Sequence, residues 1–247
     1  MTIRTDDELA ALRVVGRIAA QTLEAMRHAV RPGITTAELD QVARDVFEGQ
    51  GARSAPAMVY NFPGSTCISV NDEVVHGIPG QRVLQPGDVV KLDVTIEKDG
   101  YMADTAATVV VEPRSSNARR LASCAKQALD AALAVARAGQ PIYKVGQVVE
   151  AAVRQQGFSV IPQLCGHGIG KTIHEPPEVP NSYNPRHRGI FEEGMVLTIE
   201  PIIAAGSGRI VNEKDGWTIR TADRSLAAHF EHTLAITRGR PVVLTAA

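Results

Sequence analysis

The sequence repeats one arrangement of helices, turns and a strand at an almost constant spacing. Two passages align without gaps at an offset of 106 residues, and two short strand-like segments further along align at an offset of 107. The matched residues are Arg31, Gly33, Gln41, Val42, Gln50 and Gly51 with Arg137, Gly139, Gln147, Val148, Gln156 and Gly157, then Gly87 with Gly194 and Asp93 with Glu200. Coincidental helical composition is the alternative, but a constant offset through helix, turn, helix and strand favours an internal duplication. We therefore predict a single domain over residues 1–247 whose two halves, about 6–112 and 113–240, pack around a pseudo-twofold axis.

The pattern of apolar residues indicates the class of fold. Helical spacing covers residues 6–30, 37–48 (with Thr36 as the N-cap), 117–137 and 143–155. Strands are expected at 66–70, 74–77, 89–96, 101–112, 196–203, 217–221 and 230–237, with glycine-containing turns at 98–100 and 214–216. Because strands follow helices in each half instead of alternating with them, we predict an α+β fold with an antiparallel-rich sheet and helices on one face.

Composition excludes several functional classes. Lys and Arg total 26 against 27 Asp and Glu, so the chain has no overall basic field that would attract DNA. The charged N-terminal segment lacks the apolar core of a secretory signal, and no apolar run approaches the roughly 18 residues of a membrane span. Three cysteines, Cys67, Cys124 and Cys165, are too few for a disulfide framework. These features favour a soluble cytoplasmic protein with neither DNA nor a membrane as its partner.

Four acidic residues interrupt stretches that are otherwise apolar. Asp93 lies in a β-rich run, Asp104 follows across the predicted hairpin turn, and Glu200 and Glu231 stand in two further runs. A buried carboxylate is costly unless it is paired or bound to a cation. A single acid of this kind would more often pair with a remote base or face solvent. Four together, with few basic residues nearby, favour cation ligands.

Histidines strengthen the prediction of a metal site. His167 stands among three glycines and His174 follows seven residues later. One histidine with several carboxylates suits a pair of hard-to-borderline divalent cations. The cysteines are too few and wrongly spaced for a zinc finger. A phosphate-binding loop is excluded because the glycines around His167 precede no strong helix. Cys165 as a nucleophile is the weaker alternative. His76, just before a glycine-bounded turn, is a further candidate.

Two other histidines are left out of the predicted site. His229 and His232 flank Glu231, and the neighbours of an inward-facing residue in an extended strand point away from it.

Seven segments, taken in order, resemble type I methionine aminopeptidase. They are SVNDEVVHGIP at 69–79, LDVT at 92–95, DGYMADT at 99–105, GHGIG at 166–170, IEP at 199–201, KDGWT at 214–218 and FEHT at 230–233. The similarity runs from about residue 5 to 240. It implies the pita-bread fold and metal-dependent removal of the initiator methionine from nascent proteins, preferentially when the second residue is small.

The resemblance also implies a role for each site residue. The ligands of a dinuclear centre would be Asp93, Asp104, His167, Glu200 and Glu231, with Asp104 and Glu231 bridging, Asp93 on one ion, and His167 and Glu200 on the other. His76 would contact the substrate near the scissile amide, and His174 would stabilise the tetrahedral intermediate. Trp217, Cys67 and the stretch 59–62, including Phe62, would wall the methionine pocket.

The implied mechanism uses two divalent cations (Co, Mn, Fe or Zn) about 3.5–4 Å apart, which activate a water as hydroxide for attack on the methionine carbonyl. Glu200 would carry the proton to the leaving amine. The expected partners are nascent N-termini and Met-peptides, with transient ribosome association through the surface of the domain, and the protein is expected to be a monomer. The stretch 209–224 mixes basic and acidic residues and is interpreted as a solvated hairpin, not an RNA-binding patch.

Two competing functions keep the same fold. An Xaa-Pro peptidase would use similar ligands, although the sequence around His76 and Trp217 favours methionine. A non-catalytic binding protein would be expected to have lost ligands, whereas all five are present here.

Overall fold

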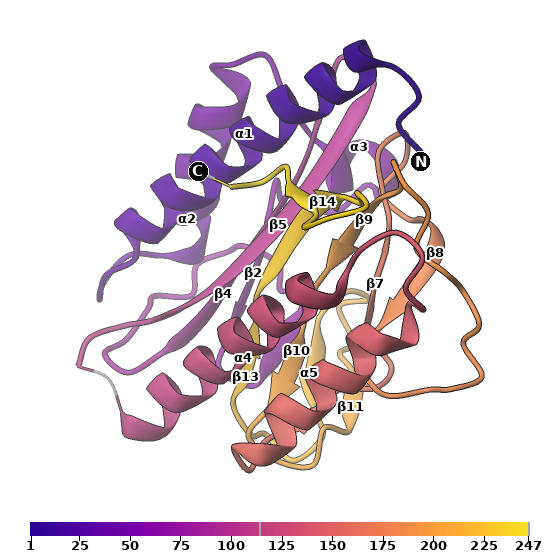
Figure 1. The fold of residues 1–247 in the computed structure, drawn as a ribbon. Coiled ribbons are helices and arrows are strands. Elements are labelled where there is room, and N and C mark those ends of the chain that lie inside the picture. The colour runs from indigo at the N-terminus through magenta and orange to yellow at the C-terminus, as the bar shows by residue number, and fades with distance from the viewer. Residues whose placement is uncertain (114, 247) are drawn as a thin grey trace.

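The computed structural model describes residues 1–113 and 115–246, and its centre is a curved, mainly antiparallel sheet (Figure 1). Within this part of the chain the main sheet has nine strands in the order β1-β4-β5-β14-β9-β7-β8, with β2 paired to β4 and β15 paired to β14. The strands are β1 (Arg53–Ser54), β2 (Cys67–Val70), β4 (Val89–Lys98), β5 (Tyr101–Val110), β7 (Cys165–Gly168), β8 (Glu175–Pro180), β9 (Val196–Ile199), β14 (Glu231–Ala235) and β15 (Val242–Val243).

Two smaller sheets complete the β structure of the described residues. One is ordered β13-β10-β6 and the other β11-β12-β3. Their strands are β3 (Glu73–Val75), β6 (Ser159–Val160), β10 (Ile202–Ala204), β11 (Ile210–Asn212), β12 (Ile219–Thr221) and β13 (Ala227–His229). The single strand predicted at 196–203 is wrong, because the chain leaves the main sheet at Glu200-Pro201 and re-enters a different sheet as β10. Proline has no N–H to donate to a ladder, which favours a break at this position.

Four long helices confirm the predicted helical segments. They are α1 (Asp6–Ala29), α2 (Thr36–Glu48), α4 (Ser116–Val135) and α5 (Tyr143–Gln155), and a short helix α3 (Ala55–Tyr60) was not predicted. The predicted N-cap of α2 is wrong by one residue. Thr35 caps the helix: its side chain accepts a hydrogen bond from the backbone N–H of Glu38, and the Glu38 carboxylate accepts one from the backbone N–H of Thr35, which completes a capping box. The Thr36 hydroxyl instead donates to the carbonyl oxygen of Gly80.

The helices pack in two pairs on one face of the main sheet (Figure 1). α1 and α2 share a buried cluster with β2, β4 and β5, and α4 and α5 share another with β9 and β14. Strand β4 shows why the opposite face is different: Leu92 and Val94 face the helices, while Asp93 between them faces away. The period of two in a strand therefore places the acids on the face that the helices do not cover.

The internal duplication stays a proposal, supported by matched backbone conformations. Gly33 and Gly139, Gly51 and Gly157, and Gly87 and Gly194 all have positive φ, between 71° and 90°. Such φ values favour glycine, so the same turn chemistry recurs at the offsets seen in the sequence.

The stretch 209–224 forms the hairpin that its sequence predicts. β11 pairs with β12, which also pairs with β3, and Arg220 makes ion pairs with Asp72, Glu73 and Glu213. Its central basic residue is therefore neutralised by acids of the same sheet. Among residues 1–113 and 115–246, no helix is both long and apolar enough to cross a bilayer.

Candidate metal centre

The uncovered face of the sheet lines a cavity of about 710 Å³. All the residues that the sequence assigned to the site, with the exception of Val59 and Asn61, line this cavity: His76, Asp93, Asp104, His167, His174, Glu200, Glu231, Tyr60, Phe62, Cys67 and Trp217. No lysine or arginine of the described residues is among its lining residues. This lining disfavours the alternative in which each acid pairs with a remote lysine or arginine.

The first two acids come from neighbouring strands joined by a tight turn. In the β4–β5 hairpin Thr95 is opposite Asp104 and Asp93 is opposite Ala106, so the two aspartates are diagonal neighbours on one face. Asp99 and Gly100 form the turn with φ of 51° and 81°. The hairpin thus holds both carboxylates on the cavity side, an arrangement that the sequence separation alone did not fix.

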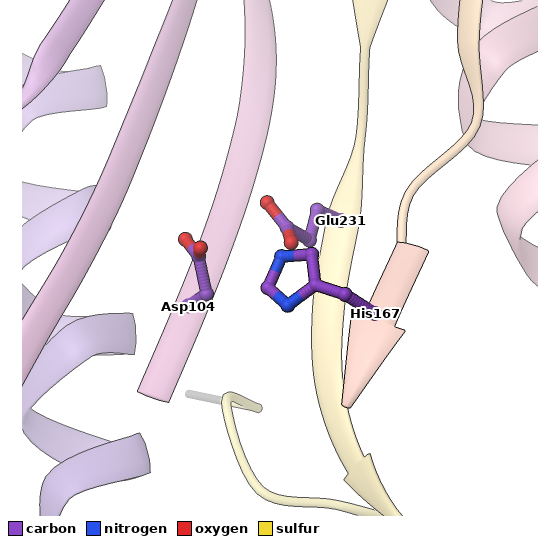
Figure 2. Close-up of side chains that lie close together, drawn as sticks. All are labelled: Asp104, His167 and Glu231. Carbon is purple, nitrogen blue, oxygen red and sulfur yellow. The ribbon is translucent and has the colours of Figure 1, made fainter. Parts of the chain in front are cut away.

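The other three candidate ligands come from the second half of the chain. Ligand atoms of Asp104, His167 and Glu231 all lie within 4.8 Å of one another. Figure 2 shows the three side chains reaching toward one another from β5, β7 and β14. Glu200, directly after β9, places Oε1 3.5 Å from Nε2 of His167. Residues that are far apart in sequence therefore meet in one cluster.

Hydrogen bonds orient the members of the cluster. The Nδ1 atom of His167 lies 3.0 Å from the carbonyl oxygen of Gly168, which makes Nδ1 the protonated nitrogen and leaves the Nε2 lone pair free. The Thr198 hydroxyl donates to Oε1 of Glu200 at 2.9 Å and accepts from the backbone N–H of His167 at 3.0 Å. Sequence analysis missed Thr198, although its position two residues before Glu200 places it on the same strand face.

Burial controls the electrostatics of the acids. Desolvation raises the pKa of Asp93, Glu200 and Glu231 well above the usual carboxyl range, and the negative charge of Asp104 raises each of them further. Burial also raises the pKa of Asp104, an effect opposed by a hydrogen bond from Thr95. Without a cation, the cluster therefore holds carboxyl groups that resist losing their protons.

The donor set fits divalent cations. Oδ1 of Asp104 and Oε1 of Glu231 are buried and have no hydrogen-bond partner among residues 1–113 and 115–246. Buried polar atoms are normally paired, so unpaired carboxylate oxygens directed into a cluster of acids indicate a missing positive charge. Four carboxylates and one imidazole are ligands that divalent cations of hard to borderline character accept.

A polar and an aromatic wall flank the cluster. The ring of His174 lies 4.3 Å from that of His167 and its Nδ1 is 2.7 Å from the Tyr60 hydroxyl. His76 has a φ of 58°, an uncommon conformation for a residue with a side chain. Phe62 and Trp217 make an edge-to-face contact with ring centroids 5.2 Å apart. Val59, by contrast, is 42% exposed and outside the lining of the cavity.

His229 corrects the sequence analysis. It lines the cavity, is 2% exposed, and places Nε2 3.6 Å from Oε2 of Glu231. Its exclusion was wrong because it is two residues from Glu231, with Phe230 between them, and residues i and i+2 of extended chain share a face. His232, the true neighbour of Glu231, lies elsewhere, with Nδ1 2.9 Å from the Thr245 hydroxyl. Burial lowers the pKa of His229 to about 3, which keeps its ring neutral.

The cysteines are unsuited to nucleophilic chemistry. Burial raises the pKa of Cys165 to about 11, with Glu200 adding to the effect, and it raises the pKa of Cys67 well above its usual range. Because the thiolate is the nucleophile, the geometry disfavours the cysteine alternative.

Comparison with known proteins agrees with this geometry. The model of metallopeptidase family M24 matches residues 10–238. A protein from Bacillus subtilis named methionine aminopeptidase 2 is 41% identical over 247 residues, which cover 99% of each chain. The crystal structure of methionine aminopeptidase from Thermotoga maritima has a TM-score of 0.96 and 32% identity, with all of both chains covered. An Xaa-Pro dipeptidase from Bacillus anthracis has a TM-score of 0.79 at 21% identity over 62% of its length, which shows the shared pita-bread fold alone.

The chain therefore belongs to metallopeptidase family M24 and is a metallo-hydrolase. Within this family, the relatives to which it is similar along its full length are named methionine aminopeptidases.

Proposed function

We propose that this protein removes the initiator methionine from nascent polypeptides, preferentially when the second residue is small. The observation that carries the proposal is the convergence of Asp104, His167 and Glu231 within 4.8 Å, at a cavity with no lysine or arginine among its described lining residues. The relatives named methionine aminopeptidase support the same activity for this chain.

Five residues would hold two divalent cations. These residues would be Asp93, Asp104, His167, Glu200 and Glu231, of which Asp104, His167 and Glu231 have ligand atoms within 4.8 Å of one another. One buried oxygen on each of Asp104 and Glu231 has no hydrogen-bond partner in the described residues, which supports both carboxylates as ligands. Co, Mn, Fe and Zn all accept this set of ligands, so experiment must identify the bound cations.

Bound cations would supply Lewis acidity, which polarises a carbonyl and lowers the pKa of water toward neutrality. Glu200 would accept a proton from water and deliver it to the leaving amine, because its carboxylate lines the cavity beside His167. His174 would donate to the oxyanion that develops on the substrate, and the contact of its Nδ1 with Tyr60 supports this role because it leaves Nε2 for the cavity. His76 would hold the scissile amide.

Phe62 and Trp217 would favour a methionine side chain. Phe62 and Trp217 line the cavity together with the buried Cys67, which lies opposite Asp93 on the neighbouring strand. A thioether gains from contact with aromatic rings and from an uncharged apolar surface. A methionine side chain lying against these residues would keep its α-carbon close to the candidate ligands.

The test is release of free methionine from the tripeptide Met-Ala-Ser. Protein stripped with a chelator should be inactive and should recover activity with Mn²⁺ or Co²⁺. The isosteric variants Asp104→Asn and Glu231→Gln should stay inactive at every metal concentration while keeping the circular dichroism spectrum of the parent.

An Xaa-Pro dipeptide serves as the competing substrate. Turnover of that peptide without release from Met-Ala-Ser would replace the proposal with an Xaa-Pro peptidase. Folded protein that binds Mn²⁺ but hydrolyses neither peptide would indicate a binding protein instead.

We further propose that the protein acts in the cytoplasm as a monomer that associates transiently with ribosomes. Three free cysteines suit a reducing compartment, and nascent N-termini emerge at the ribosome. The candidate ligands all come from one chain, so the site needs no partner subunit to complete it.

A further inference from the structure

His229 is a buried histidine held firmly at the end of β13. Its backbone N–H donates to the Thr108 hydroxyl at 2.9 Å, and that hydroxyl donates back to the carbonyl oxygen of His229 at 2.8 Å. His229 also lies opposite Ile202 of the neighbouring strand β10. The ring therefore has a fixed origin on a strand of the small sheet and extends into the cavity.

The ring lies between two of the candidate ligands. Nε2 is 3.6 Å from Oε2 of Glu231 and 3.8 Å from Oε2 of Glu200. Neither ring nitrogen has a hydrogen-bond partner in the part of the chain that the structure describes. An imidazole that is 2% exposed and unpaired, yet directed at two carboxylates, is poised to donate to them.

In each of Glu200 and Glu231, Oε2 is the carboxylate oxygen that faces His229. Oε1 of Glu200 accepts from Thr198 and faces His167, so Oε2 is the oxygen directed at His229. In Glu231, Oε1 is the buried oxygen without a partner and Oε2 is the one nearest His229. Each carboxylate oxygen has two lone pairs, so Oε2 can accept a hydrogen bond and still serve as a ligand.

We propose that His229 is a positioning residue, whose Nε2–H donates to Oε2 of Glu200 and Glu231 and holds both glutamates in register for the cations. The inference rests on the proposed metal centre. Donors behind a ligand fix its orientation, and losing one typically weakens metal binding by about 10–100-fold.

The test compares a substitution that keeps a donor with one that removes it. In His229→Gln the side-chain amide can still donate, whereas His229→Leu fills the space without a donor. Titration calorimetry of chelator-stripped protein with Mn²⁺ alone should give a dissociation constant within about 3-fold of wild type for His229→Gln and about 10–100-fold weaker for His229→Leu. His232→Gln and His232→Leu are the matched controls on the opposite face and should both bind Mn²⁺ as wild type does.

Two calorimetric results would overturn the proposal. Equal weakening in both His229 variants would show that the imidazole itself is needed, as it would be for a metal ligand. Binding unchanged in both would show that His229 only fills space.

A measurement on the unsubstituted protein avoids any folding defect of the variants. In Zn²⁺-loaded, ¹⁵N-histidine-labelled protein, long-range ¹H–¹⁵N correlation reports which ring nitrogen carries the proton. A protonated Nε2 on His229 supports the donor role, and an unprotonated, metal-bound Nε2 contradicts it. Wild-type release from Met-Ala-Ser is measured in parallel, so failure of the proposed function is distinguished from failure of this inference.

Discussion

Substituting Gly166 by alanine should disable the metal centre through a backbone clash and not through a lost ligand. A Cβ atom at Gly166 would lie 2.4 Å from the carbonyl oxygen of Thr198 and 3.2 Å from Cβ of Val179. Ordinary contact begins near 3.4 Å, so β7 would have to move from β9 by about 1 Å. That displacement would break the 3.0 Å hydrogen bond from His167 N to the Thr198 hydroxyl.

The magnitude follows from the two losses. Overpacking costs about 1–3 kcal/mol and a lost hydrogen bond about 0.5–1.5 kcal/mol, so the free energy of unfolding of the metal-free protein should fall by about 2–4 kcal/mol. A ligand displaced by about 1 Å can cost about 10²-fold in rate, so kcat/KM for Met-Ala-Ser should fall by about that factor.

Urea unfolding and peptide hydrolysis measure these effects. Gly80→Ala is the matched control, because a Cβ there would meet no atom within 4 Å and the φ of Gly80 lies outside the left-handed region. The control should change stability by less than about 1 kcal/mol and leave hydrolysis unchanged. If Gly166→Ala retained wild-type stability and a kcat/KM within 2-fold of wild type, the argument from close strand approach would be wrong.

Three further outcomes are expected. Because burial raises the pKa of the candidate ligand acids in the folded state, their contribution to the stability of the metal-free protein should be lost as pH rises above the ordinary carboxyl range. The urea midpoint of wild type minus that of Asp104→Asn cancels the contribution of the buried histidines, so this difference should fall between pH 5 and pH 8, and Mn²⁺ should reduce the fall. Tyr60→Phe removes the 2.7 Å contact with Nδ1 of His174, so kcat for Met-Ala-Ser should fall by about 2–10-fold. Because Tyr60 is 42% exposed, the urea midpoint of the protein should stay unchanged. Trp217→Ala opens the aromatic wall, and steady-state kinetics should show KM raised more than kcat is lowered; the opposite split would place Trp217 outside the methionine pocket.

Local patterns predicted the helices and the acids for a clear physical reason. A carboxylate within an apolar strand violates the burial rule, so Asp93, Asp104, Glu200 and Glu231 could be recognised without knowledge of the fold. The helix at 143–155 was predicted to its exact ends because its apolar spacing and the following glycine agree.

Non-local pairing accounts for what the sequence did not reveal. β7 is rich in glycine and has little intrinsic strand propensity, yet β8 and β9 hold it in the sheet and so position His167. The short helix α3 depends on Ser54, whose side chain accepts a hydrogen bond from Ala57 N. His229 was a different kind of error, since correct counting along the strand would have placed it in the site.

The location of the candidate ligands explains how the fold tolerates so many buried acids. They stand on β4, β5, β7 and β14 and directly after β9, strands paired within the main sheet, and apolar residues of β4, β5, β9 and β14 pack against helices on the opposite face. Phe62 and Trp217, which line the cavity, lie outside those strands, after α3 and in the turn between β11 and β12. Substitutions in these peripheral segments can therefore change the preferred side chain without moving a ligand, because segments between strands vary more freely than paired strands. The ligand acids lack that freedom. Each is desolvated by the same sheet that positions it, so a shift of any one strand would both misplace a ligand and leave a charge buried without its cation.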